Sequence, residues 1–316
     1  MGMQDQLTDI PARPLYRPYL SSGVAFQIGM RPMEPGQWLS IGPDHGPFMR
    51  EKRARLLANP LPFYRTTPGS LAAQIELRDR VIAHLLAHHA DVFAMADGRL
   101  VDLVEGTAHD LADPLREPLA LISALVEEDF ILLQQVDGHD QITAASNAYS
   151  SSGRIVASVG RSIPWAHKFV PTLNDQLGSR IDRILANIQS DAPVERFNWL
   201  LTPIASRLFP EDPHAANAAA VQKIVDALAE DPGRAGELLS IRVERQTLLR
   251  LPGTGALAFS IYTHSDPLSS VAGDAGSLAA MQRLISGYSE DRMQYAAMAP
   301  IRAPVLAWLA ERSRRL

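Results

Sequence analysis

The segment from Val243 to His264, VERQTLLRLPGTGALAFSIYTH, constrains the fold more than any other part of the sequence. In its second half, Leu257, Phe259 and Ile261 alternate with small or polar residues, which is the period of two expected for a strand with one buried face. The turn before that half, PGTG, holds two glycines, which adopt the positive φ angles of tight turns without steric cost. The segment therefore predicts a β-hairpin.

The first strand of this hairpin carries arginine on both faces. One face would present Arg242, Glu244, Gln246 and Arg250, and the other Val243, Arg245, Thr247 and Leu249. Buried charges need a partner or a ligand, so this strand does not suit a plain apolar sandwich. Two interpretations stay open: an edge hairpin with solvated arginines and one ion pair from Glu244, or a strand that lies against something polar.

Composition narrows the class of protein. The chain has 316 residues, 46% of them hydrophobic, which is enough for a large core in one or two domains. Its net charge of −5, without long runs of like charge, argues against nucleic acid as the main partner. Because there is no cysteine, the chain cannot form disulfides, hold an iron–sulfur cluster or supply a thiolate to haem. We find no apolar run of membrane-spanning length and no signal peptide, and we expect a soluble, cytoplasmic protein without a membrane partner.

We expect a single domain over residues 1–316, in three parts. Residues 1–70 are rich in proline and predict an extended arm that wraps a surface, with a short helix near residues 50–58. Residues 71–265 form the core, with helical insertions, and residues 266–316 add helices near 276–287, 290–298 and 303–315. Ser70 is the expected N-cap of a helix that carries His84 and His88. Their spacing suits a metal, but the glutamate of an HExxH site is absent, which favours solvated or partly packed histidines.

Turn signals and periodicity place the remaining elements. A hairpin turns at Asp97-Gly98, and residues 137–140 join strands at 130–136 and 142–149. Helices are expected at 115–128, 174–188 and 215–230, and a further element opens at Arg196. No GxSxG motif surrounds the serines at 150–152, which argues against a serine hydrolase.

The short segment GRSIPWAHKFVP, residues 160–171, is rich in residues with special backbone or side-chain properties. Pro164 and Pro171 flank His167 and restrict its backbone. A lone histidine is more often a packed or solvated residue than a ligand, so the spacing alone does not assign a role.

The chain resembles the alpha subunit of haem-dependent oxidative N-demethylase, a family built on a haem-binding PAS-like domain. The similarity runs over most of the chain and is carried by IGMRPMEPGQWL, VEEDFILLQQVDG, SSSG, GRSIPWAHKFVP, RFNWLL and VERQTLLRLPGTGALAFSIYTHSDPL. It implies an α+β fold with a PAS-like antiparallel sheet, surrounding helices, an extended arm and a helical C-terminus. Phe169 stands where the family has a proline, and Ala166 where it has isoleucine.

The resemblance also implies roles for single residues. His167 matches the histidine of the family, which implies that it is the proximal ligand of haem b iron. Haem propionates need cations, and the arginines available are Arg154, Arg161, Arg242, Arg245 and Arg250. An apolar slot is expected from Phe130, Trp165, Phe169, Leu257 and Phe259, each of which is otherwise ordinary core. Glu244 and Tyr262 are expected to hold a cationic amine, through charge and cation–π contact respectively.

By this resemblance the protein is a monooxygenase-like oxidoreductase. Reduced haem iron binds O2, and a small amine is oxidised to an imine that hydrolyses to amine and aldehyde. Electrons come from NADPH through a separate reductase subunit with FMN and a 2Fe-2S cluster, since this chain has neither a GxGxxG fingerprint nor cysteine. Two alternatives stay open, a haem-binding PAS sensor and a haem-free structural subunit, and the oligomeric state is not fixed.

Overall fold

The structure is a computed structural model that describes residues 14–24, 28–58, 62–113, 116–148, 154–166, 173–203, 213–295 and 298–316. Its strands are β1 (Arg31–Pro32), β2 (Tyr64–Thr66), β3 (Phe93–Ala96), β4 (Arg99–Asp102), β5 (Thr107–His109), β6 (Asp129–Val136), β7 (His139–Ser146), β8 (Val194–Thr202), β9 (Ser240–Arg250) and β10 (Leu257–Pro267). Its α-helices are α1 (His45–Ala58), α2 (Leu71–His88), α3 (Pro118–Ser123), α4 (Arg154–Ala157), α5 (Ile163–Ala166), α6 (Leu173–Asn187), α7 (Pro213–Glu230), α8 (Ala235–Leu238), α9 (Ala275–Gly287), α10 (Glu290–Tyr295) and α11 (Arg302–Arg314). Short 3-10 turns are η1 (Pro18–Leu20), η2 (Pro35–Gln37), η3 (Pro68–Ser70), η4 (Pro232–Arg234), η5 (Leu268–Val271) and η6 (Ala299–Ile301).

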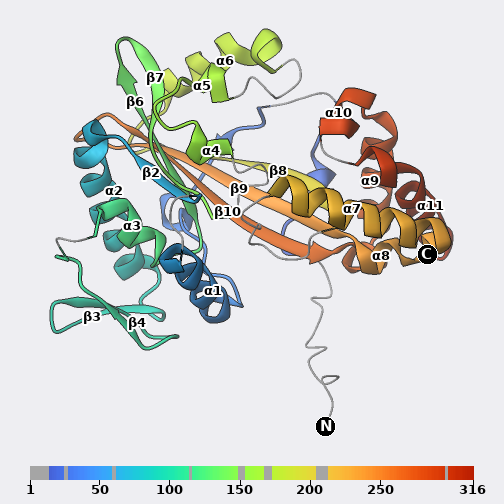
Figure 1. The fold of residues 1–316 in the computed structure, drawn as a ribbon, viewed down its shortest axis with the longest axis horizontal. Helices are drawn as coiled ribbons and strands as arrows, with labels where there is room; N and C mark the ends of the chain where they lie inside the picture. The colour runs from blue at the N-terminus through green and yellow to red at the C-terminus, as the bar shows by residue number, and fades with distance from the viewer. Residues whose placement is uncertain are drawn as a thin grey trace.

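The predicted hairpin, β9 and β10, forms the centre of a seven-stranded antiparallel sheet. The strand order is β1-β8-β9-β10-β6-β7-β2, so β9 has a neighbour on each side (Figure 1). The edge-hairpin interpretation is therefore wrong, because each strand of the hairpin has a neighbouring strand on both sides. The α+β class is confirmed, and the PAS-like assignment stays a prediction.

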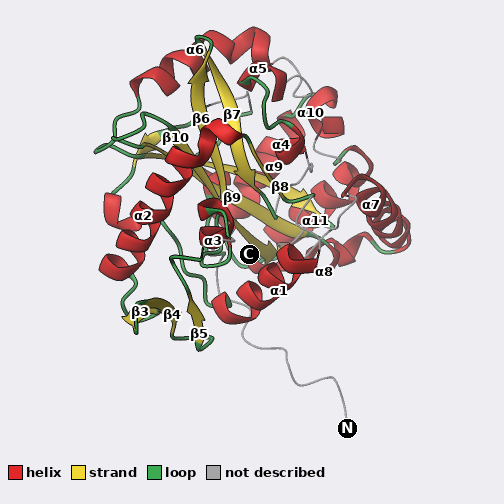
Figure 2. Cartoon of the chain, turned by 60° about the vertical axis from the view of Figure 1, so that its left-hand side comes forward, coloured by secondary structure: helices red, strands yellow, loops and turns green. Residues whose placement is uncertain are grey.

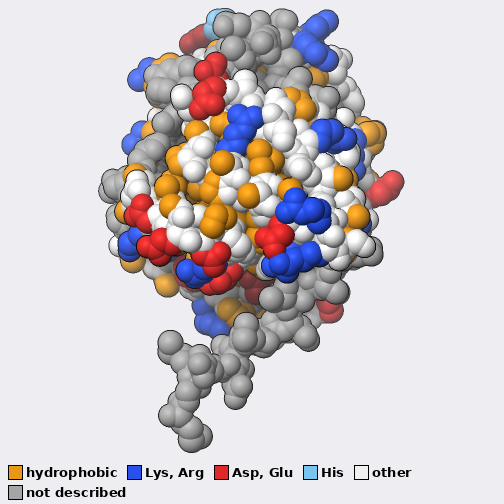
Figure 3. Space-filling view, turned by 90° about the vertical axis from the view of Figure 1, so that its right-hand side faces the viewer, with side chains coloured by type: hydrophobic (Ala, Val, Ile, Leu, Met, Phe, Trp, Pro, Cys, Tyr) orange, Lys and Arg blue, Asp and Glu red, His pale blue; other side chains and the backbone are white. Residues whose placement is uncertain are grey.

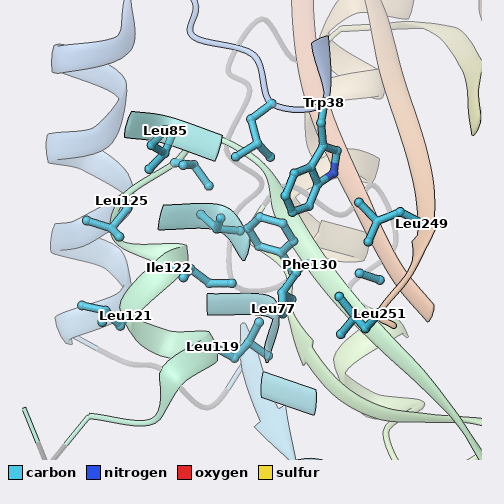
Figure 4. Packing of buried hydrophobic residues seen from close by; sticks show 14 of the residues in the cluster. Trp38, Leu77, Leu85, Leu119, Leu121, Ile122, Leu125, Phe130, Leu249 and Leu251 are labelled. Carbon is cyan, nitrogen blue, oxygen red and sulfur yellow. The ribbon is translucent and has the colours of Figure 1, made fainter. Parts of the chain in front are cut away.

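The central strands present two faces with different neighbours. On one, Leu248, Ile261 and Leu257 pack against residues of α4, α5 and α6, and we call it the helix face. On the other, Leu249, Ala258 and Phe130 pack against the N-terminal arm, α2 and α3, and we call it the arm face. Figure 4 shows Phe130 between Trp38, Leu77 and Ile122. Burial of these side chains from water stabilises the arrangement of helices on both sides of the sheet.

A second core lies where the C-terminal helices cover the β8–β9 end of the sheet. Ile241 and Val243 from β9 pack with Leu284 of α9 and with Trp308 and Leu309 of α11. The C-terminal helices expected from the sequence are all present, as α9, α10 and α11. The outer surface on the side of α9, α10 and α11 mixes apolar patches with arginines and carboxylates (Figure 3).

The N-terminal arm crosses the arm face and is held there through its backbone. Arg245 donates to the carbonyls of Gln37 and Trp38, at 2.6 and 3.2 Å. His84 Nε2 accepts from the backbone N–H of Leu39 at 3.3 Å, and Glu128 Oε1 accepts from that of Ser40 at 2.7 Å. Side chains of the core thus replace the strand partners that residues 37–40 of an extended arm lack, and the wrapping of the whole arm stays a prediction.

Several local predictions differ from the structure. The helix expected near 50–58 begins earlier, at His45, and the one expected at 115–128 is shortened to α3, because residues 129–136 enter the sheet. Ser70 precedes α2 but makes no capping hydrogen bond; its hydroxyl donates to the carbonyl of Thr67. Beyond α2, β3, β4 and β5 form a small separate sheet (Figure 2), and the predicted turn at Asp97-Gly98 is confirmed by positive φ angles at both residues.

Candidate functional site

Strand register places a row of polar side chains on the helix face. Glu244 of β9 lies directly between Asn198 of β8 and Thr263 of β10, and Gln246 lies beside Arg196. Side chains directly opposite one another in an antiparallel sheet share a face, and their Cβ atoms are about 5 Å apart. With Arg242, two residues before Glu244, these side chains form what we call the polar row: Arg196, Asn198, Arg242, Glu244, Gln246 and Thr263.

The polar row joins two guanidinium groups to one carboxylate. Arg242 is almost completely buried, and its Nε lies 3.8 Å from Glu244 Oε1. Gln246 Nε2 donates to the other carboxylate oxygen at 3.0 Å. Burial lowers the pKa of the Arg196 guanidinium, and the charge of Glu244 opposes that shift. The row therefore places two guanidinium groups beside one carboxylate in a partly buried setting, which suits an anionic group of a ligand.

Some polar atoms beside this row have no hydrogen-bond partner among the residues that the structure describes. They include Arg196 Nε, Thr263 Oγ1 and both amide atoms of Asn147. Asn147 follows Ser146 at the end of β7, and strand alternation points it toward the helix face. Buried polar groups in native proteins are nearly always paired, so the unpaired Arg196 Nε and Thr263 Oγ1 on this face suit a polar ligand.

Arg161 and Trp165 lie together at another part of the helix face. They line a pocket of about 680 Å³ at the turn of the β6–β7 hairpin, against α5 and α6. The Arg161 guanidinium carbon lies 5.5 Å from the centre of the Trp165 ring. Because Leu257 pairs with Leu133 near that turn and Ile261 pairs with Asp129 at the start of β6, the pocket and the polar row occupy opposite ends of the face.

Phe259 and Leu257 lie between these two ends. Both belong to the apolar cluster under α4–α6, as expected for the wall of an apolar slot. Phe130 differs, since it is completely buried on the arm face, within the core that includes Trp38. We therefore assign Phe130 to the core and remove it from the expected slot.

Two other predicted cofactor residues have their donors engaged by the protein. Arg245 lies on the arm face, where its Nε donates to Glu195 Oε2 at 2.7 Å. Arg250 donates to the carbonyls of Leu185 and Ile188, at 2.6 and 2.8 Å, and so binds the C-terminal end of α6. Both geometries favour structural roles, and a contact of either residue with a propionate stays a prediction.

Glu244 and Tyr262 do not lie on the same side of the sheet. Thr263 is the residue opposite Glu244, whereas Tyr262 is opposite Arg245 and points to the arm face. A small amine cannot contact both side chains at once, because the sheet lies between them. Only Glu244 belongs to the polar row, and a role for either residue in binding an amine stays a prediction.

The histidines divide in a way that the sequence did not predict. His45, His84 and His109 are all buried. His264, at the end of the predicted hairpin, points to the arm face near Tyr16, and its Nε2 lies 3.1 Å from Asp266 Oδ1. His167 and Phe169 lie outside the described residues, and so does the side chain of Arg154, the first residue of α4.

The sequence did not predict four polar residues of this face as site residues: Arg196, Asn198, Thr263 and Asn147. The segment RFNWLL does alternate polar and apolar residues, so Arg196 and Asn198 were detectable as one face of a strand. Only the register with β9 shows that this face is shared with Glu244.

Within the part of the chain that is described, no three histidine or carboxylate side chains form a group that could hold a metal ion. None of the helices there is both long enough and apolar enough to span a membrane.

Comparison with known families gives a match that covers most of the chain. The family model described as "Haem-dependent oxidative N-demethylase, alpha subunit-like" matches residues 29–306. The matched region begins just before β1 and ends within α11, so it contains the whole sheet and both of its faces.

Proposed function

The chain belongs to the haem-dependent oxidative N-demethylase, alpha subunit-like family, and from this premise we propose that it binds haem b and oxidises a small amine with O2. When bound, haem supplies the redox chemistry that converts the amine to an imine, which water hydrolyses to amine and aldehyde. The observation that supports this proposal best is the polar row, where Arg196 and Arg242 stand beside Glu244 on one buried face.

We propose that haem lies on the helix face. A macrocycle needs an apolar wall, and Phe259, Leu257 and Ile261 offer one. Its propionates need cations in a site of low dielectric, and Arg242 and Arg196 are cations of that kind, with Arg196 Nε unpaired among the described residues. We propose His167 as the axial ligand and keep Arg154 as a candidate for a propionate, whereas Arg161 and Trp165 line the separate pocket at the β6–β7 turn.

Glu244 is proposed to bind the cationic amine. Its carboxylate is largely buried, so an ammonium beside it would gain more than at an exposed site. Gln246 donates to one oxygen and holds the carboxylate in place, while a carboxylate has lone pairs for several further donors. The role of Glu244 is thus to bind and orient the amine, and that of the apolar wall is to exclude water.

We propose that electrons arrive from a separate subunit. The name of the family refers to an alpha subunit, which indicates a multi-subunit enzyme. With no cysteine, this chain cannot hold a 2Fe-2S cluster, so we assign the cluster, FMN and NADPH binding to a partner reductase.

The proposal is tested by adding haem to the purified protein and recording its absorption spectrum. We expect stoichiometric uptake, a histidine-ligated spectrum and a spectral change when a small alkylammonium is added. Arg242→Gln should raise the haem dissociation constant about tenfold through loss of a charged hydrogen bond. Arg234→Gln is the matched control, because Arg234 is exposed and pairs with Glu237. Failure to take up haem would remove the proposal, and uptake without any response to amines would favour the sensor alternative.

A further inference from the structure

Thr263 is the buried partner of Glu244 across the central strand pair. The two residues lie directly opposite each other in the register of β9 and β10, on the helix face. Thr263 is only 2% exposed, and its Oγ1 has no hydrogen-bond partner among the described residues. A buried hydroxyl without a partner is destabilising, so its presence beside a carboxylate points to a ligand that both residues share.

The two side chains can accept hydrogen bonds at neighbouring points. Gln246 donates to Glu244 Oε2, and Arg242 Nε is 3.8 Å from Oε1, too far for a hydrogen bond. A threonine hydroxyl has two acceptor lone pairs and one donor. With Cβ atoms about 5 Å apart, the carboxylate and the hydroxyl can approach one small group from two sides.

We propose that Thr263 Oγ1 is the second acceptor for the ammonium group that Glu244 binds. This inference rests on the proposed function, in which a cationic amine lies at Glu244. An alkylammonium with two or more N–H bonds can donate one to each residue. A trialkylammonium has a single N–H, which the carboxylate takes because it carries the charge. Thr263 thus favours ammonium ions that have a second N–H bond to donate, whereas Glu244 binds any of these cations through its charge.

The inference makes different predictions for two probes of equal charge. Dimethylammonium donates two hydrogen bonds and trimethylammonium one. Thr263→Val keeps the branched shape of the side chain and removes the hydroxyl. It should weaken dimethylammonium binding about tenfold and leave trimethylammonium binding unchanged. Glu244→Gln should weaken both, because both ligands are cations.

The experiment is isothermal titration of haem-loaded protein with each chloride salt. Ser146→Ala is the matched control. Ser146 is also fully buried, and its hydroxyl has no partner among the residues that the structure describes, but it points to the arm face, beside Phe130. This variant should alter neither affinity. Thr263→Ser, which retains the hydroxyl, should restore the preference for dimethylammonium and shows whether the valine variant failed only through packing.

If Thr263→Val weakens the binding of both ammonium ions, or of neither, the proposed role of Thr263 is wrong. If Glu244→Gln still weakens both ligands in that case, the proposed function stands without it. Wild-type protein that takes up no haem, or binds neither ammonium ion, would instead contradict the proposed function itself. The thermal midpoint of the haem-free Thr263→Val protein should not fall, because the Thr263 hydroxyl has no hydrogen-bond partner to lose among the described residues, and a fall would indicate a structural role.

Discussion

Arg245 and Glu195 form a buried ion pair, with Nε and Oε2 2.7 Å apart, on the face of the sheet opposite to Glu244. Both residues are less than a tenth exposed. The same guanidinium donates to the carbonyls of Gln37 and Trp38 in the arm. The charged residues of β9, which do not suit a plain sandwich core, therefore have different roles on the two faces of the sheet. Arg245 holds the arm on one face, and Arg242 and Glu244 belong to the polar row on the other.

Arg245→Leu should lower the free energy of unfolding by about 3–5 kcal/mol, because it leaves Glu195 buried without this partner. Arg31→Leu is the control, since Arg31 binds the other oxygen of Glu195 but is 62% exposed. That variant should lose less than about 1 kcal/mol. Urea denaturation measures both. Equal losses would mean that Arg245 is not the anchor, and faster haem loss from a stable Arg245→Leu protein would restore its predicted role at a propionate.

Arg250→Leu should increase the rate of haem loss, because Arg250 holds α6 in place. Arg250 binds carbonyls at the C-terminal end of that helix, and the helix begins shortly after His167. Freeing this end allows the segment that carries the proposed ligand to move. Transfer of haem to an excess of apomyoglobin measures the rate, and Arg180→Leu, an exposed position on the same helix, is the control. An unchanged rate of haem loss in Arg250→Leu would mean that Arg250 only stabilises the hairpin.

His45 should make stability fall with rising pH. Burial would lower its pKa, but the carboxylates of Asp102 and Glu127 outweigh burial and raise the pKa to about 9. Its Nδ1 lies 3.1 Å from Glu127 Oε1, and its Nε2 lies 3.6 Å from Asp102 Oδ2. A histidine with a raised pKa in the folded state contributes stability below its unfolded pKa of about 6.5, and this contribution is lost as the pH rises through 9.

The contribution is on the order of 3 kcal/mol. His45→Gln should remove the decline between pH 6.5 and 9, as measured by urea denaturation at several pH values. His139→Gln, at an exposed position in the β6–β7 turn, should retain the decline. Glu128 also makes stability fall with rising pH, but at lower pH than His45 does. The reason is that burial raises the pKa of its carboxyl group to about 7. A His45→Gln protein whose stability still falls above pH 7 would show that another group is responsible.

The chain alone, supplied with NADPH, should not oxidise any amine. It contains no cysteine and no GxGxxG fingerprint, so it lacks the means to bind a nicotinamide and pass on single electrons. Absorbance at 340 nm follows NADPH consumption. Steady consumption by the pure chain, with no contaminating reductase, would contradict the need for a partner.

The sequence predicts those features that depend on local periodicity. Alternation within β9 and β10, and the glycines between them, are enough to place the hairpin and to show that Arg242 and Glu244 share a face. The relation between Glu244 and Tyr262 was not predictable in the same way. It depends on the register between two strands, and a shift of one residue would bring them to the same face.

Burial of the ionisable residues depends on contacts between distant segments. His45 meets Asp102 and Glu127 only after α1, β4 and the residues before β6 have come together. No local pattern at His45 predicts this, and its neighbours Asp44 and Gly46 indicate a solvated turn. Asn147 and Thr263 were missed for the same reason, because an unpaired polar atom is recognised only when everything around it is known.

The central claim is that this chain binds haem through His167. The most direct measurement is the absorption spectrum of haem-loaded His167→Ala beside that of His264→Ala. We predict that His167→Ala loses the histidine-ligated spectrum and regains part of it when imidazole is added, and that His264→Ala keeps the spectrum, because His264 points to the arm face. A wild-type spectrum in His167→Ala, with its loss in His264→Ala, would contradict the account.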